Sequence, residues 1–212
     1  MSSAILGGFA ALLMVSTAPG VAVVAVKPPT LEQLRAALIA PEDLGDAYVP
    51  NTKRNREALD SEAAGTQKCV RAMKALKPLL ASKAAAFIDE DGEPAGVKQF
   101  VVSATPAKLA SWEAVGKVMV RDCVGAKAGG DGPKRSTTKL SIGKFGDWTY
   151  GIRHRQTVPE KSLSPIYAAD VVLIRVKSTV TLLVSDGFFA KFDPSLSKRA
   201  AKVAVSKLRN AQ

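Results

Sequence analysis

Two cysteines, Cys69 and Cys123, place the strongest restriction on the fold of this 212-residue chain. Both fall within predicted helices, over residues 66–81 and 106–123, and both lie on the apolar stripe of their helix. The two stripes recur every three or four residues, at Cys69, Met73, Leu76 and Leu80 and at Trp112, Val115, Met119 and Cys123. Both thiols therefore face a hydrophobic core, and a bond between them would hold the two helices together.

The N-terminus has the pattern of a secretory signal peptide. The run AILGGFAALLMV is continuously apolar, no charged side chain precedes Lys27, and small residues favour cleavage after Ala25. We therefore predict a signal peptide over residues 1–25 and a single domain over residues 26–212. The segment lacks a basic residue at its start, and residues 4–26 are long enough to span a bilayer as a helix, so an uncleaved membrane anchor is the alternative.

Export decides how the cysteines are interpreted. Two thiols of one small domain usually pair in an oxidising compartment, so we predict a Cys69–Cys123 disulfide and a location outside the cell or on the outer face of its envelope. A metal site needs three or four ligands, whereas the chain has one histidine, His154, and no CxxC motif. Nothing near either cysteine supports a nucleophile activated by His154. We predict no metal and no cofactor.

The remaining segments alternate between strand and helix patterns. A short helix is predicted over residues 30–38, and a C-terminal helix is predicted from Pro194. Strands are predicted within residues 85–104 and 147–158, and a buried hairpin is predicted over residues 169–187. Helices and antiparallel strands in separate runs indicate an α+β fold, with an antiparallel sheet flanked by helices in a single disulfide-braced domain.

The segment 147–158 supplies most of the candidate ligand-binding residues. Its period-two alternation places Trp148, Tyr150, Ile152 and His154 on one face. We expect these side chains and Trp112 to line a cleft between sheet and helix that takes up an apolar or amphiphilic molecule, oriented by one polar group. The alternative for His154 is a hydrogen-bonded position at the edge of the core.

Charge is distributed unevenly along the chain. Residues 1–93 carry 10 basic and 11 acidic side chains, whereas residues 94–212 carry 20 basic and 8 acidic ones. A basic half attracts polyanions, and outside a cell these are anionic lipids, teichoic-type polymers or acidic glycans. A solvated lysine-rich surface is the simpler interpretation. No nucleic-acid recognition motif occurs, so nucleic acid is not an expected partner.

Several motifs resemble those of a known family. They are LIAPEDLGDAYV, the cysteine that opens the helix over residues 66–81, SATPAKLASWEAVGKVMVRDC, GDWTYGIR and VVLIRVKSTVTLLV. Over roughly residues 30–210 the chain resembles the extracellular sensor domain of actinobacterial PknH-like receptor kinases and their secreted or lipoprotein relatives. The resemblance implies a helix-flanked antiparallel sheet with a ligand cleft and no catalysis. The chain departs from the family in having cysteines for one disulfide rather than two, and it has no kinase domain.

The combined prediction is an exported, non-catalytic ligand-binding or sensor-like domain of the cell envelope. No GxSxG, HExxH or phosphate-binding glycine loop occurs in the chain. Two alternatives remain at this stage: a secreted hydrolase with an atypical site, and a structural envelope protein retained by charge. The ligand and the signalling partner are not predicted.

Overall fold

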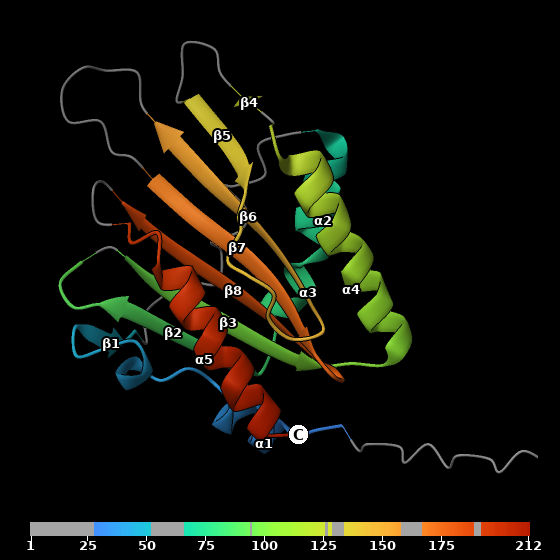
Figure 1. Cartoon of the computed structure of the whole chain (residues 1–212), viewed down its shortest axis with the longest axis vertical. Coiled ribbons are helices and arrows are strands. Elements are labelled where there is room, and N and C mark those ends of the chain that lie inside the picture. The colour runs from blue at the N-terminus through green and yellow to red at the C-terminus, as the bar shows by residue number, and fades with distance from the viewer. Residues whose placement is uncertain are drawn as a thin grey trace, which may run out of the picture.

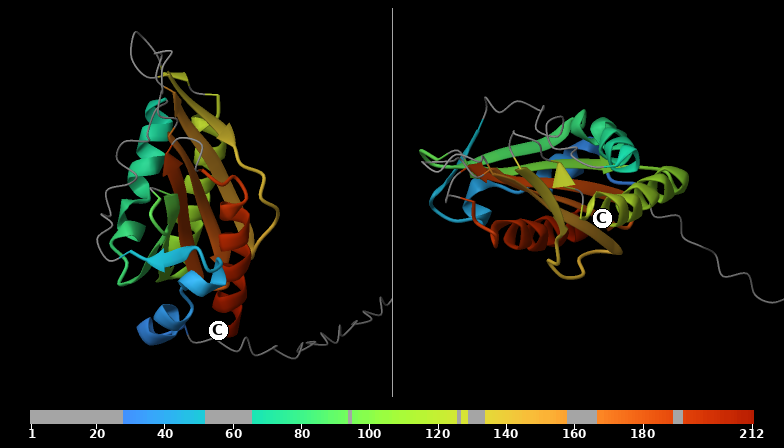
Figure 2. Two further views of the ribbon diagram at one scale, coloured as in Figure 1. Left: turned by 90° about the vertical axis from the view of Figure 1, so that its left-hand side faces the viewer. Right: turned by 90° about the horizontal axis from the view of Figure 1, so that it is seen from above.

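The computed structural model describes residues 28–51, 66–93, 95–125, 127–128, 134–157, 167–188 and 192–212. Its central element is an antiparallel sheet of eight strands in the order β1-β2-β3-β8-β7-β6-β5-β4 (Figure 1). The strands are Tyr48–Pro50 (β1), Ala84–Glu90 (β2), Ala95–Ser103 (β3), Lys127–Ala128 (β4), Lys134–Lys139 (β5), Trp148–Thr157 (β6), Tyr167–Val176 (β7) and Thr179–Phe188 (β8). Helices cover both faces of the sheet (Figure 2), so the predicted α+β fold is confirmed.

The β7–β8 hairpin forms the middle of the sheet and is buried on both faces. Side chains alternate along β7, so that Val171 and Leu173 enter one core while Val172 and Ile174 enter the other. The tight turn between the two strands requires a residue with positive φ, and Lys177 adopts this conformation with a φ of 49°. The hairpin predicted over residues 169–187 is thereby confirmed.

One face of the sheet carries α2 (Gln67–Ala75), α3 (Lys77–Leu80), α4 (Pro106–Val118) and the π-helical turn η2 (Met119–Cys123). Thr66 and Thr105 begin α2 and α4, because each side chain accepts a hydrogen bond from a backbone N–H in the first helical turn. The apolar sides of these helices form one core with Phe100, Leu173 and Leu182 of the sheet.

The predicted Cys69–Cys123 disulfide is present and joins α2 to η2. The two Cα atoms lie 4.9 Å apart, and both cysteines are buried in the core on this face. The bond closes a loop across 54 residues of sequence separation, so it ties together two helices that the chain forms far apart.

The opposite face carries α5 (Leu196–Asn210) and the N-terminal α1 (Leu31–Ala36), which is followed by the 3-10 turn η1 (Pro41–Asp43). Buried ion pairing fixes the start of α5. The Arg153 guanidinium donates two hydrogen bonds to the Asp170 carboxylate, at 2.6 and 2.7 Å, and the Ser197 hydroxyl donates a third at 2.5 Å. Asp170 is 0% exposed. Its buried carboxylate on β7 thus connects Arg153 of β6 to Ser197 of α5.

The predicted helix over residues 66–81 is divided. α2 ends at Ala75, and α3 begins at Lys77 with Pro78 in its first turn, because proline supplies no N–H to the preceding turn. The break changes the buried face: Leu79 is fully buried, whereas Leu80, predicted to continue the apolar stripe, is only partly buried.

Other segments also differ from the predictions. The strands β1, β4 and β5 were not predicted. α5 begins at Leu196 rather than at Pro194, since Asp193 accepts a hydrogen bond from the Ser195 N–H just before the helix.

The predicted signal peptide, residues 1–25, lies outside the described residues. Among the helices of the described part of the chain, none combines the length and the apolar composition needed to cross a bilayer.

Candidate functional site

A pocket of about 410 Å³ lies at the edge of the sheet, where β6 extends past the end of β5. β5 pairs with β6 as far as Lys139, opposite Ile152, and the chain then leaves the sheet and returns at Trp148. This connecting loop, residues 140–147, projects on the side that carries α5 (Figure 2). The pocket is lined by Lys139, Leu140, Ser141, Ile142, Gly143, Lys144, Asp147, Trp148, Thr149 and Tyr150.

Contacts with the β7–β8 turn fix the end of this loop. Gly146 has a φ of 63°, and a Cβ atom there would lie 2.0 Å from the Arg175 carbonyl oxygen, so only glycine fits. The Asp147 N–H donates to the same carbonyl at 2.8 Å, and the Asp147 carboxylate accepts a hydrogen bond from the Lys177 N–H at 2.7 Å. The Gly-Asp pair of the GDWTYGIR motif thus anchors the loop to the central hairpin.

A second set of contacts shapes the loop from within. The Phe145 N–H donates to the Thr149 hydroxyl at 3.0 Å, and that hydroxyl donates to the Phe145 carbonyl at 2.5 Å. Ile142 is buried in the core beneath α5, and Leu140 and Phe145 pack against the same core. The loop is therefore held by its own hydrophobic contacts as well as by the hairpin.

Two aromatic side chains form one wall of the pocket. The ring centroids of Trp148 and Tyr150 lie 5.4 Å apart at an interplanar angle of 42°. Burial raises the pKa of the Tyr150 hydroxyl, while the neighbouring Lys117 lowers it and Glu113 raises it. The hydroxyl therefore remains protonated at neutral pH, and it forms a hydrogen bond with Glu113 of α4.

The structure separates the five predicted ligand-binding residues into two groups. Trp148 and Tyr150 line the pocket. Trp112, Ile152 and His154 are 3%, 4% and 2% exposed and lie inside the protein. Helix α4 packs directly onto β6, because Gly116 of α4 lies against the Tyr150 ring. Of the five, Trp148 and Tyr150 line the pocket. The ligand-binding role of all five residues remains a prediction.

His154 is held in the sheet beside Thr137, whose hydroxyl lies 3.3 Å from the imidazole Nδ1 atom. The Nε2 atom is buried and has no hydrogen-bond partner among the described residues. Burial lowers the pKa of the imidazole, and the Arg135 guanidinium lowers it further. His154 is therefore neutral at pH 7 and is placed in the interior rather than on a surface that a substrate could reach.

The residues that sequence reasoning missed belong to the connecting loop. Leu140, Ile142 and Lys144 were not proposed as binding residues, because their sequence shows neither helical nor strand periodicity. The two glycines of this segment, Gly143 and Gly146, are the sequence signal that could have indicated a turn here, and the structure places both at positive φ.

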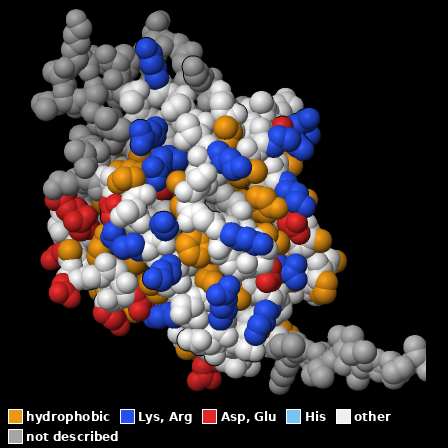
Figure 3. Space-filling model, viewed as in Figure 1, with side chains coloured by type: hydrophobic (Ala, Val, Ile, Leu, Met, Phe, Trp, Pro, Cys, Tyr) orange, Lys and Arg blue, Asp and Glu red, His pale blue; other side chains and the backbone are white. Residues whose placement is uncertain are grey.

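Charged side chains lie at the rim of the pocket. Lys139 and Lys144 are exposed there, as is Asp147, whose carboxylate accepts the hydrogen bond from the Lys177 N–H. Figure 3 shows Lys and Arg side chains spread over the face that carries α5, while acidic side chains gather at the edge near β1 and the β2–β3 turn, where Asp46, Glu90 and Asp91 lie. The pocket thus combines apolar walls with a rim that carries two lysines and one aspartate. In the described part of the chain, no three His, Cys, Asp or Glu side chains are arranged to hold a metal ion.

No protein-family model and no curated protein sequence matches the chain. Among solved structures, the chain is similar to the crystal structure of the extracellular domain of PknH from Mycobacterium tuberculosis, with a TM-score of 0.57 and 14% sequence identity. The similarity covers 87% of this chain and 98% of that domain. The two proteins therefore share a fold over nearly the whole of the PknH extracellular domain.

Proposed function

We propose that this protein is a non-catalytic, sensor-like binding domain of the cell envelope that takes an amphiphilic molecule into the pocket beside β6. The observation that carries the proposal is the pocket itself, of about 410 Å³, with Leu140, Ile142, Trp148 and Tyr150 in its walls and lysines at its rim. Ligand sites of small molecules are mostly apolar hollows of this size with a few polar groups that orient the ligand.

The lysines define the polar part of the proposed ligand. Lys139 and Lys144 are both exposed, and no carboxylate in the described part of the chain forms an ion pair with either of them. A ligand with an anionic group at one end and an apolar body at the other would place its charge at the rim and its body against Trp148 and Tyr150.

The location and the sensor role rest on other observations. The signal-peptide pattern and the Cys69–Cys123 disulfide are typical of an exported protein. The shared fold with the extracellular domain of a receptor kinase supports a domain that binds rather than catalyses. Since fold alone does not fix function, the pocket must be tested directly.

The test is thermal unfolding of the purified protein with fractions of an envelope lipid extract. A ligand that binds the folded state raises the melting temperature, and mass spectrometry of the bound fraction identifies it. Trp148→Leu and the double variant Lys139→Ala/Lys144→Ala should lose the shift, whereas Lys198→Ala/Lys202→Ala, which removes two exposed lysines from α5, should keep it. No shift with any fraction, or an equal shift in all variants, would count against the proposal.

A further inference from the structure

A second hollow lies between α2 and α4, on the face of the sheet opposite α5. Its volume is about 300 Å³, and it is lined by Lys68, Arg71, Ala72 and Ala75 of α2 and by Ala114, Val115 and Val118 of α4. We call this hollow the α2–α4 groove. Ala75 and Ala114 are exposed on its two sides, so the groove is an open apolar channel rather than part of the core.

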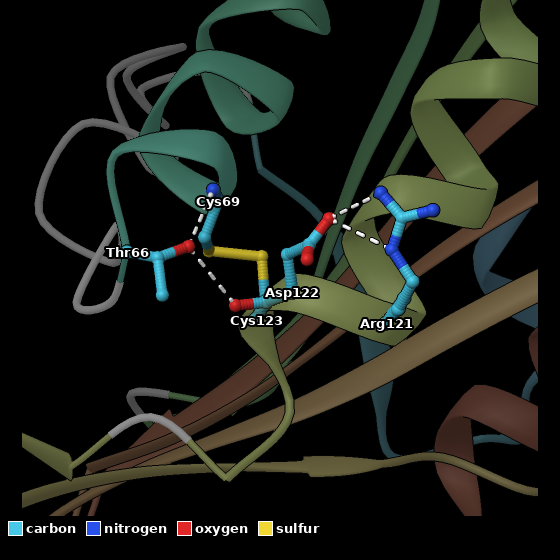
Figure 4. Close-up of polar contacts among 5 residues, drawn as sticks. All are labelled: Thr66, Cys69, Arg121, Asp122 and Cys123. Carbon is cyan, nitrogen blue, oxygen red and sulfur yellow. Dashed lines mark hydrogen bonds and ion pairs between the residues drawn. A yellow bond between two sulfur atoms is a disulfide. The ribbon is translucent and has the colours of Figure 1, made fainter.

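The helices that form the groove are tied together at one end. Figure 4 shows the Cys69–Cys123 bond joining α2 to the end of η2, with Thr66 beside it. The Thr66 hydroxyl accepts a hydrogen bond from the Cys69 N–H at 3.2 Å and donates one to the Asp122 carbonyl at 3.3 Å. Alanines face the gap beyond this junction, and their side chains are too small to fill it. The groove is thus a fixed feature of two braced helices.

The helices around the groove are strongly basic. In α2, α3, α4 and η2 the basic residues are Lys68, Arg71, Lys74, Lys77, Lys108, Lys117 and Arg121, and the acidic ones are Glu113 and Asp122. Both acids are paired, Glu113 with Lys117 and Asp122 with Arg121, each at 2.7 Å. In the described part of the chain, no acidic side chain forms an ion pair with Lys68 or Arg71, the two cations of the groove.

We propose that the α2–α4 groove docks the domain onto an anionic lipid bilayer, with apolar lipid entering the groove and lipid phosphates meeting Lys68 and Arg71. Charge complementarity carries the proposal, because an apolar surface with cations along it has the composition of a membrane-binding helix face. The groove shares no lining residue with the pocket beside β6, so the two sites can be tested separately.

The experiment measures sedimentation of the full chain with phosphatidylglycerol–phosphatidylcholine vesicles and with pure phosphatidylcholine vesicles. The wild type should bind the anionic vesicles far more strongly. Lys68→Gln/Arg71→Gln should lower the partition coefficient roughly 30-fold if each cation contacts lipid, from about fivefold per basic residue. Ala75→Gln/Ala114→Gln, which adds polar bulk to the groove without changing net charge, should also weaken binding.

Matched controls alter the other helical layer. Lys198→Gln/Lys202→Gln on α5 makes the same change in net charge, and Ala36→Gln/Ser206→Gln adds two amides at exposed positions. Both should bind as the wild type does, and melting temperatures should show that every variant is folded. Trp148→Leu should also retain vesicle binding, which separates this test from that of the β6 pocket.

Four results would overturn the proposal. The first is an absence of wild-type binding to anionic vesicles, and the second is an equal loss of binding in the α5 control. The third is full binding by Ala75→Gln/Ala114→Gln. The fourth is that dextran sulfate displaces the wild type completely from the vesicles and that the two groove variants bind vesicles as the wild type does. The last of these would assign the basic helices to a soluble polyanion instead.

Discussion

Gly116 of α4 lies so close to Tyr150 of β6 that a Cβ atom on Gly116 would come within 2.3 Å of the tyrosine ring. This contact sets the distance between the helix layer and the sheet. It also fixes the tyrosine ring in the wall of the β6 pocket, which links the packing of α4 to the shape of the candidate site.

Gly116→Ala should therefore destabilise the protein. Alanine favours the helix by up to about 1 kcal/mol over glycine, but overpacking against a ring typically costs about 1–3 kcal/mol. Urea unfolding should show a net loss in the wild type and little or no loss in a Tyr150→Ala background. Equal effects in the two backgrounds would mean that the contact does not determine the spacing.

Removing the disulfide should weaken the fold without abolishing the sheet. Cys69→Ala/Cys123→Ala frees a loop of 54 residues of sequence separation, which lowers the free energy of unfolding by about 4 kcal/mol in the loop-entropy description. Denaturation with and without reductant provides the measurement. Reductant should destabilise the wild type and leave the double variant unchanged; a wild type indifferent to reductant would contradict the prediction.

Asp170→Asn should be among the most destabilising single changes. It leaves the Arg153 guanidinium, whose pKa is raised by its hydrogen bonds to Asp170, without a buried counter-charge. Loss of one partner of such a pair costs about 3–5 kcal/mol. Chemical unfolding would measure this loss beside Glu113→Gln, which removes a surface ion pair with Lys117 and should cost far less.

The double variant Arg153→Met/Asp170→Leu distinguishes a missing counter-charge from a missing contact. Because it removes both charges together, it should recover much of the stability that Asp170→Asn loses. A double variant as unstable as Asp170→Asn would show that the contact with Ser197, rather than charge balance, is what α5 requires.

His154 should make stability fall as the solution becomes acidic. Its pKa is lowered in the folded state by burial and by Arg135, so the unfolded chain takes up the proton first. Above the unfolded pKa of about 6.5 both states are neutral and stability is unaffected; below it the free energy of unfolding decreases, by at most about 1.4 kcal/mol per pH unit. His154→Gln should lack this component when urea unfolding is compared at pH 7.5, 6.5 and 5.5. If the wild type and His154→Gln showed the same dependence of unfolding free energy on pH, the prediction would be wrong.

The sequence predicted the fold where local periodicity and packing agree. The stripe through Trp112 and Cys123 and the two apolar runs around Lys177 each identified an element and its buried side, since core positions repeat at the period of the backbone. The break between α2 and α3 was missed although Pro78 marks it, because helical spacing continues across the proline in the sequence and only the structure shows Leu79 turned inward.

The candidate site was predicted less completely. Period-two alternation found Trp148 and Tyr150, which line the pocket, but it gave the same weight to Ile152, which the core covers. The difference depends on where β5 ends and on how residues 140–147 fold back onto the turn at Lys177. These are contacts between segments distant in sequence, and no local pattern encodes them.

The sheet ends in very short strands on both sides. β1 has three residues and finishes in Pro50, and β4 has two. A proline and so little exposed backbone give a second molecule few hydrogen-bonding groups to extend. Pairing between the sheet edges of two copies of this valine- and leucine-rich domain, the first step toward a fibril, is thereby disfavoured.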